Sequence, residues 1–180
     1  MTEIAPKDLF QLNVGHIIQH NIGYYRDIDF ITPSIRIQPD LELSDLDGSV
    51  RVTKTARGLI FKITMTANVT LECVRCLDTY QQKLTIETTE LFVFSASDLD
   101  EGSYLLPENG KVDLTPFVRE EMLLSIPIKS LCRQDCLGLC PICGENMNEI
   151  QCNHIVENID PRFNGLQALL NTDPDSGVQD

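Results

Sequence analysis

The chain has 180 residues, 42% of them hydrophobic, which is enough for one ordinary domain with a buried core. Its formal net charge of -13 argues against a protein that coats nucleic acid through a basic surface. The first ten residues lack a basic segment followed by an apolar run, and no stretch approaches the roughly 20 apolar residues that cross a membrane. We therefore expect a cytoplasmic protein with no membrane contact.

Residues 1–34 give a mixed signal, in which short apolar pieces alternate with polar ones. His16 and His20 lie four residues apart, but nothing nearby completes a site, so we interpret both as structural or surface histidines. From residue 35 onward the hydrophobic period becomes two, which predicts strands. The apolar positions that show it are Ile35, Ile37, Leu41, Leu43, Val50 and Val52.

A local basic cluster is the one candidate for direct contact with nucleic acid. Its four cations fall within twelve residues: Arg51, Lys54, Arg57 and Lys62. A solvated strand and turn edge explains the same residues, and we favour that interpretation.

The clearest strand signal covers residues 59–73, where every odd position is apolar and the even positions from 62 to 72 are polar. Fifteen residues would span about 50 Å if straight, so we expect this strand to bend or to pass between two sheets, as in a barrel or sandwich. A second extended segment returns from Tyr80 to Phe94. The two segments predict a hairpin with the Cys73–Val74–Arg75–Cys76 motif at its tip.

Residues 95–112 are polar and predict a loop. Thr115 as a cap, Pro116 at the first helical position and an apolar stripe predict a helix over about residues 113–126 that packs on the sheet. Asp160 and Pro161 predict a last short helix, and residues 172–180 predict a disordered tail.

The predicted fold class is α+β. It combines a mainly antiparallel, barrel-like or sandwich-like sheet and a helix with a C-terminal cysteine module that is zinc-ribbon-like. We divide the chain into a β-rich domain at 1–126, a cysteine-rich metal-binding module at 127–171 that packs on it, and the tail.

Seven cysteines and one histidine supply eight possible ligands for structural zinc, as one or two ions. They are Cys73, Cys76, Cys132, Cys136, Cys140, Cys143, Cys152 and His154. In a reducing compartment, arrays of CxxC and CxxxC pairs bind metal or catalyse more often than they form disulfides, and seven cysteines cannot all pair. The segment from Cys140 to Gly144 has the form of a zinc knuckle, with a glycine that lets the backbone turn.

Eight ligands can divide in more than one way. The preferred division joins Cys73 and Cys76 to Cys132 and Cys136, and leaves Cys140, Cys143, Cys152 and His154 as a second site. A rival division places Cys132, Cys136, Cys140 and Cys143 on one ion. A third possibility is a single zinc ion with Cys73 and Cys76 as bystanders.

Enzyme signatures are missing from the sequence. It contains no HExxH, no GxSxG and no phosphate-binding glycine loop, so we predict a non-enzymatic protein without catalytic residues. A thiol redox or metal-relay function of the CxxC pairs is the alternative. Redox pairs normally open a helix that lowers the thiol pKa, whereas strands flank Cys73 and Cys76 here.

The order of four segments resembles the YceD-type large ribosomal RNA subunit accumulation proteins. The segments read LECVRCLD, VDLTPFVREEMLLSIPIK, LCRQDCLGLCPICGENMN and IDPRFNGLQALL, and the resemblance covers roughly residues 45–171. It implies a cytoplasmic, non-catalytic role in the synthesis, processing or stability of large-subunit ribosomal RNA. The residues that carry over are Cys73, Arg75, Cys76, Cys132, Cys136, Cys140, Cys143 and Cys152, with His154 where many relatives have another cysteine.

The acidic charge and this resemblance together predict how the protein reaches the large ribosomal subunit. We expect recruitment through a ribosomal protein or an assembly factor, with direct RNA contact left open.

Overall fold

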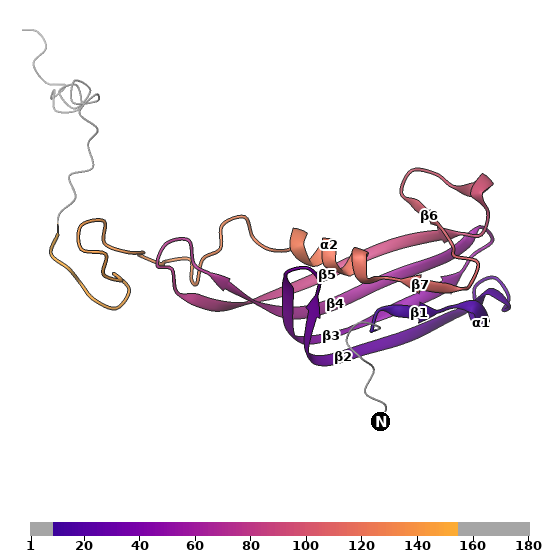
Figure 1. Ribbon diagram of the computed structural model, residues 1–180, viewed down its shortest axis with the longest axis horizontal. Coiled ribbons are helices and arrows are strands. Elements are labelled where there is room, and N and C mark those ends of the chain that lie inside the picture. Colours follow the sequence, from indigo (N-terminus) through magenta and orange to yellow (C-terminus); the bar gives the residue numbers. More distant parts are fainter. Residues whose placement is uncertain (1–8, 155–180) are drawn as a thin grey trace, which may run out of the picture.

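The computed structural model describes residues 9–154 (Figure 1). Within that range the chain forms seven strands, two α-helices and one short 3-10 helix. In chain order they are β1 (Gln11–Asn13), α1 (Gly15–Ile18), β2 (Tyr25–Ile37), β3 (Leu41–Lys54), β4 (Gly58–Glu72), β5 (Thr79–Val93), η1 (Ala96–Asp98), β6 (Ser103–Leu105), β7 (Lys111–Asp113) and α2 (Thr115–Leu124). The prediction of an α+β fold dominated by strands is confirmed.

Five strands form one open sheet in the order β2-β3-β4-β5-β6. Strands β2 to β5 pair antiparallel with their neighbours, and β6 adds to β5 in parallel. The barrel expectation is wrong, because β2 and β6 lie at opposite edges of the described sheet and do not pair (Figure 1). The length of β4 is accommodated by an elongated hairpin with β5, which follows it over fifteen residue pairs, and closure is not needed.

The alternation predicted for β4 is confirmed. Leu59, Phe61, Ile63 and Met65 are fully buried, whereas Lys62 and Thr64 are exposed on the opposite face. The buried face supplies most of the hydrophobic core, and β1, α1, β7, α2 and the residues that adjoin them supply the rest. Phe92 of β5 lies between the sheet and α2, with its ring centroid 4.9 Å from that of Phe61 and 5.7 Å from that of Phe117 in α2.

Two parts of the prediction need correction. Strand β2 begins at Tyr25, ten residues before the predicted strand. The prediction missed its first part because this edge strand, with Pro33 and two aspartates, shows only weak alternation. The segment predicted as a loop at 95–112 contains η1, β6 and the start of β7. Three-residue strands are too short to show a period, and β7 is stabilised by pairing with β1 about a hundred residues earlier.

Helix α2 lies inside the predicted range of 113–126, with Pro116 in its first turn and Val118 and Met122 buried. Thr115 is the first helical residue and not the cap; its N–H donates to the Asp113 carboxylate at 2.9 Å. The helix predicted after Asp160 and the tail at 172–180 lie outside the described residues, and the domain division at 126/127 stays a prediction.

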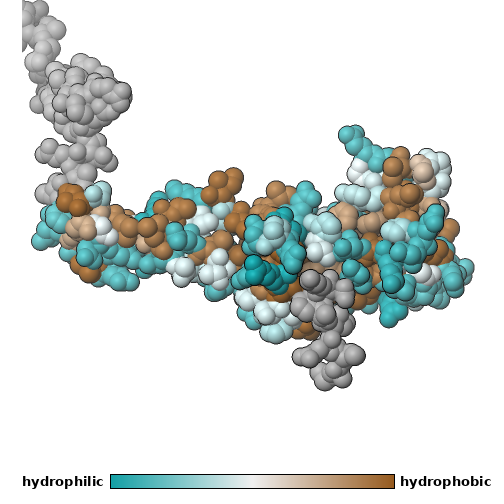
Figure 2. Space-filling model, in the orientation of Figure 1, coloured by the Kyte–Doolittle hydropathy of each residue, from teal (hydrophilic) through white to brown (hydrophobic). Residues whose placement is uncertain are grey.

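The cysteine-rich segment extends beyond one end of the sheet, at the tip of the β4–β5 hairpin (Figure 1). Hydrophobic and hydrophilic residues are mixed on the visible surface of both the sheet and this segment (Figure 2). Among residues 9–154, no helix is both long enough and apolar enough to span a bilayer.

Candidate metal centre

The β4–β5 hairpin carries the first pair of cysteines at its tip, as predicted. Pairing continues to Glu72 and Thr79, so Cys73 and Cys76 lie in the turn that joins the strands. The second pair, Cys132 and Cys136, comes from the segment after α2. A hydrogen bond from the Val74 N–H to the Ser130 carbonyl, 2.9 Å long, holds that segment against the turn.

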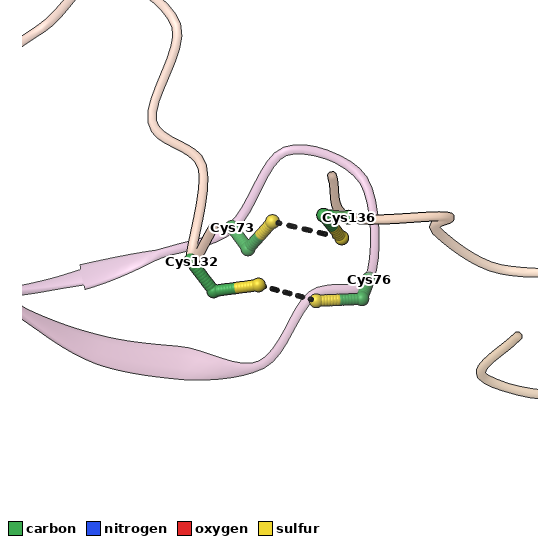
Figure 3. A group of neighbouring side chains, drawn as sticks. All are labelled: Cys73, Cys76, Cys132 and Cys136. Atoms are coloured by element: carbon green, nitrogen blue, oxygen red, sulfur yellow. Dashed lines mark hydrogen bonds between the residues drawn. The ribbon is translucent and has the colours of Figure 1, made fainter. Parts of the chain in front are cut away.

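The four side chains converge on one point (Figure 3). The Sγ atoms of Cys73 and Cys136 are 3.8 Å apart, and those of Cys76 and Cys132 are 3.6 Å apart. A disulfide would bring two sulfurs to about 2.05 Å. Zn–S bonds of about 2.3 Å in a tetrahedron place two sulfurs about 3.8 Å apart. The spacing therefore fits four thiolates around one zinc ion and does not fit two disulfides.

A second group of ligand atoms lies in the same segment, formed by Cys140, Cys143, Cys152 and His154. Cys140 Sγ and His154 Nδ1 are 3.6 Å apart, and tetrahedral zinc with one sulfur and one nitrogen ligand requires about 3.6 Å. The two groups differ in exposure. Three of the four cysteines in the first are buried, whereas Cys143 and His154 of the second are exposed.

The two CxxC turns share one backbone conformation. In the first, the Leu77 N–H donates to the Cys73 carbonyl at 2.9 Å and the Cys73 N–H donates to the Asp78 carbonyl at 2.9 Å. In the second, the matching bonds run from Gly144 to Cys140 and from Cys140 to Glu145, both 2.8 Å long. The residue after the second cysteine has a positive φ in both turns, 64° at Leu77 and 77° at Gly144. Two sequence-distant segments thus fold into the same knuckle.

Backbone donors in these turns stabilise thiolates. Burial raises the pKa of Cys73, but hydrogen bonds from three backbone N–H groups outweigh burial and lower it to about 6. These donors belong to Cys132, Cys76 and Arg75. The N–H groups of Cys143 and Ile142 likewise lower the pKa of Cys140 to about 6, against the effect of burial.

Three other thiols of the same groups, Cys76, Cys132 and Cys152, have raised pKa values. Burial is the largest cause at Cys132, and the neighbouring Cys140 sulfur is the largest cause at Cys152. Without a cation the clustered sulfurs therefore cannot all ionise together. A divalent metal ion would reverse this, because a coordinating thiol is deprotonated.

Residues outside the ligand set fix the first group in place. Arg75 Nη1 donates to the Cys136 carbonyl at 2.6 Å, and the Leu139 N–H donates to the Arg75 carbonyl at 3.1 Å. Asn148 Nδ2 lies 3.4 Å from the Cys136 sulfur, and the Asn148 Oδ1 accepts the Leu137 N–H at 2.9 Å. Such outer contacts orient metal ligands and compensate the charge of thiolates.

The structure groups the ligands as in the preferred division of the sequence. The rival set of Cys132, Cys136, Cys140 and Cys143 does not form a cluster among the described residues. Sequence reasoning missed Asn148 and Asn146, the latter donating to the Asp78 carboxylate at 2.8 Å. Their importance depends on contacts across the fold, and no spacing in the sequence signals it.

The basic cluster of the sequence is not a free cationic patch. Arg51 pairs with Asp27 at 2.7 Å, Arg57 with Asp100 at 2.8 Å, and Lys62 with Glu87 at 2.7 Å; Lys54 donates to the carbonyls of Ile18 and His20. The two histidines also have structural contacts. His16 Nε2 is 2.9 Å from Arg26 Nη1, and the His20 ring stacks on Tyr24. Both observations favour the solvated-surface interpretation.

Comparison with known proteins shows that the region with both cysteine groups matches one protein family. The sequence profile of the family described as "Large ribosomal RNA subunit accumulation protein YceD" matches residues 61–170, more than half of the chain. An uncharacterized protein of Mycobacterium tuberculosis is 33% identical over 136 residues, which cover 73% of this chain and 65% of that protein. The uncharacterized protein YlbN of Bacillus subtilis is 31% identical over 123 residues, which cover 67% of this chain and 72% of YlbN.

The match to the mycobacterial proteins thus spans slightly less than two thirds of their length. No solved structure matches the chain significantly.

Proposed function

Because this chain belongs to the YceD family of large ribosomal RNA subunit accumulation proteins, we propose that it is a zinc-stabilised, non-enzymatic factor in the synthesis, processing or stability of large-subunit (23S) ribosomal RNA. The observation that carries the proposal is the family match over residues 61–170, which contains all eight candidate ligands. We place its action in the cytoplasm, where ribosomes assemble.

Zinc has a structural role in this proposal. One ion is held by Cys73, Cys76, Cys132 and Cys136, and a second by Cys140, Cys143, Cys152 and His154. Each ion supplies folding free energy, since a preformed site rarely exists in an unfolded chain. Four protein ligands leave no open position for substrate, which separates these sites from catalytic zinc centres.

The partner is the large ribosomal subunit or one of its assembly factors, reached mainly through protein contacts. The net charge of -13 and the pairing of the local basic cluster support this route. Binding of the zinc-loaded protein to protein-free ribosomal RNA should be weak. Tight binding that weakens steeply as salt rises would contradict a protein-mediated route.

A conditional depletion strain tests the proposal. Loss of the protein should reduce mature large-subunit RNA and large subunits, with the small subunit spared, and the unaltered chain should restore both. Replacing Cys73 and Cys76 together with serine should prevent rescue, while Ser130→Ala, which alters only a side chain near the site, should rescue. Normal large-subunit RNA after depletion would overturn the proposal.

A thiol redox or metal-relay function predicts a different behaviour. Cys73 is fully buried, and exchange with another disulfide requires access to the thiolate. If zinc is structural, the four cysteines of the first group resist alkylation until a strong chelator is added. Rapid alkylation of Cys73 or Cys76 in zinc-loaded protein would favour the redox alternative.

A further inference from the structure

Strand β5 has one edge that is paired only at its end. It pairs with β4 from Thr79 to Val93, but with β6 only from Leu91 to Val93. Figure 1 shows β5 as the last long strand on its side of the sheet. Among residues 9–154, no backbone hydrogen bond reaches the outer edge between residues 79 and 90. We call this stretch the β5 edge.

Two hydrogen bonds determine which backbone groups of β5 face outward. The Phe94 N–H donates toward β4, to the Arg57 carbonyl at 3.0 Å, and the Val93 carbonyl accepts the Leu106 N–H on the β6 side at 2.9 Å. Successive residues of an antiparallel strand alternate in direction. The odd-numbered residues therefore direct their N–H and C=O groups outward, namely Gln81, Lys83, Thr85, Glu87 and Thr89. One side chain, the Gln82 amide, contacts the Lys83 carbonyl at 3.0 Å.

The opposite edge of the sheet is protected in a way that β5 is not. Strand β2 contains Pro33, which lacks an N–H group and is skipped in the pairing with β3. Proline and interrupted pairing are common means of blocking an edge strand. Strand β5 contains no proline or glycine, and its pairing with β4 runs without a register shift. It is a long, regular template for another strand.

The negative charge near the β5 edge favours an added strand that carries cationic side chains. Glu90 lies half-buried near Glu120 and Glu121 of α2, and none of the three forms an ion pair with a described residue. Burial and the two neighbouring carboxylates raise the pKa of Glu90, against a hydrogen bond from Thr88. Arg119, which precedes Glu120 in the chain, pairs with Asp40 at 2.6 Å. Within residues 9–154, these three carboxylates therefore have no ion-pair partner, and Glu90 lies on the strand with the unpaired edge.

We propose that the β5 edge, residues 79–90, binds an extended segment rich in lysine or arginine from a ribosomal protein, as an added strand of the sheet. Main-chain hydrogen bonds to the odd-numbered residues supply affinity, and cationic side chains next to Glu90, Glu120 and Glu121 supply specificity. The ribosomal source of the segment rests on the proposed function; the added strand itself does not.

Hydrogen exchange tests the added strand directly. The probe is a twelve-residue peptide of alternating lysine and threonine, added to the full zinc-loaded chain. The amides of Gln81, Lys83, Thr85, Glu87 and Thr89 should exchange rapidly in the free protein and about tenfold more slowly with peptide. Slow exchange in the free protein would mean that the chain covers this edge itself, and would overturn the proposal. Unchanged exchange with saturating peptide would also overturn it.

Two variants separate the backbone contribution from the charge contribution. Thr85→Pro removes one outward N–H and leaves the β4 pairing in place, and should weaken peptide binding about tenfold or more, whereas Thr85→Ala should bind as the parent does. Glu90→Gln combined with Glu121→Gln should weaken the lysine–threonine peptide severalfold and leave an alternating serine–threonine peptide unaffected. Equal binding by the proline and alanine variants would overturn the proposal.

The depletion strain distinguishes failure of this inference from failure of the proposed function. Rescue of large-subunit RNA by Thr85→Ala but not by a stably folded Thr85→Pro supports both. Equal rescue by the two variants overturns the use of the β5 edge and leaves the proposed function standing. A depletion without effect on large-subunit RNA removes the ribosomal source of the strand together with the proposed function.

Discussion

Leu77 has a backbone conformation that a leucine side chain disfavours. It has a φ of 64°, the left-handed region, at the position where the second knuckle has Gly144. A side chain there costs about 1–2 kcal/mol, and Leu77 is 56% exposed, so it gains little from burial. We predict that Leu77→Gly increases the free energy of unfolding by up to about 1 kcal/mol, since the extra flexibility of the unfolded glycine offsets part of the relief.

Denaturant unfolding of the zinc-loaded protein measures this change. Gly144→Ala is the matched control, because a Cβ at Gly144 meets no atom within 4 Å and only the backbone is strained. It should lower stability by about 1 kcal/mol. A loss of stability in Leu77→Gly would show that the leucine side chain makes contacts that outweigh its strain.

Glu90 makes stability depend on pH in a direction opposite to most surface acids. Its pKa is raised in the folded protein, mainly by burial, so ionisation above its ordinary range favours the unfolded chain. We predict that Glu90→Gln increases the free energy of unfolding at pH 7, and that the gain disappears at about pH 4 and below, where the carboxyl is protonated in both states. Unfolding curves between pH 3 and 8 measure the difference.

Glu87 is the matched control on the same strand. A hydrogen bond from Lys62 lowers the pKa of Glu87, so ionisation favours the folded state and Glu87→Gln should lower stability at pH 7 but not in acid. If both substitutions changed stability in the same direction at pH 7, the assignment of opposite environments to the two acids would be wrong.

At the scale of elements, the link between the two ligand groups depends on Gly138. It has a φ of 80°, and a Cβ there would lie 3.0 Å from the Arg75 carbonyl oxygen. That carbonyl accepts the Leu139 N–H and fixes the link to the first knuckle. We predict that Gly138→Ala lowers the free energy of unfolding by about 2 kcal/mol or more in total. This loss is larger than that of Gly144→Ala, because at Gly138 a close backbone contact is added to the strain. Zinc-dependent unfolding of the two variants compares them; equal losses would contradict a tight link.

The elements that the sequence predicted well are those with a long local signal. Eight alternating apolar positions predicted β4, and the return segment predicted the hairpin that carries Cys73 and Cys76. The early part of β2 was missed because its alternation is weak around Pro33, and β6 and β7 were missed because three residues are too few to show a period. Strand β7 also depends on β1, its partner about a hundred residues earlier. The same limit applies to the site: ligand spacing suggested the grouping, but the contacts of Arg75 and Asn148 exist only in the folded chain.

For the whole molecule, the sheet and the cysteine-rich segment have separate cores. The main core joins the sheet to β1, α1, β7 and α2 and contains no cysteine. A second, smaller cluster gathers Cys73, Cys76 and Cys136 with Tyr80, Leu131 and Cys132 at the hairpin tip. The candidate metal ligands are thus the main buried groups of the second cluster, and they contribute nothing to the first.

This separation predicts a partial response to metal removal. Excess chelator should release two zinc ions per chain, with the ion at Cys140, Cys143, Cys152 and His154 leaving first because two of its ligands are exposed. Amides of residues 131–154 should then lose protection, because the clustered thiols of each group repel one another as they ionise without a cation. Amides of β3 and the first half of β4 should stay protected by the main core. Hydrogen exchange with and without chelator, together with zinc analysis, measures both effects; loss of protection throughout the sheet would show that its stability depends on the metal as well.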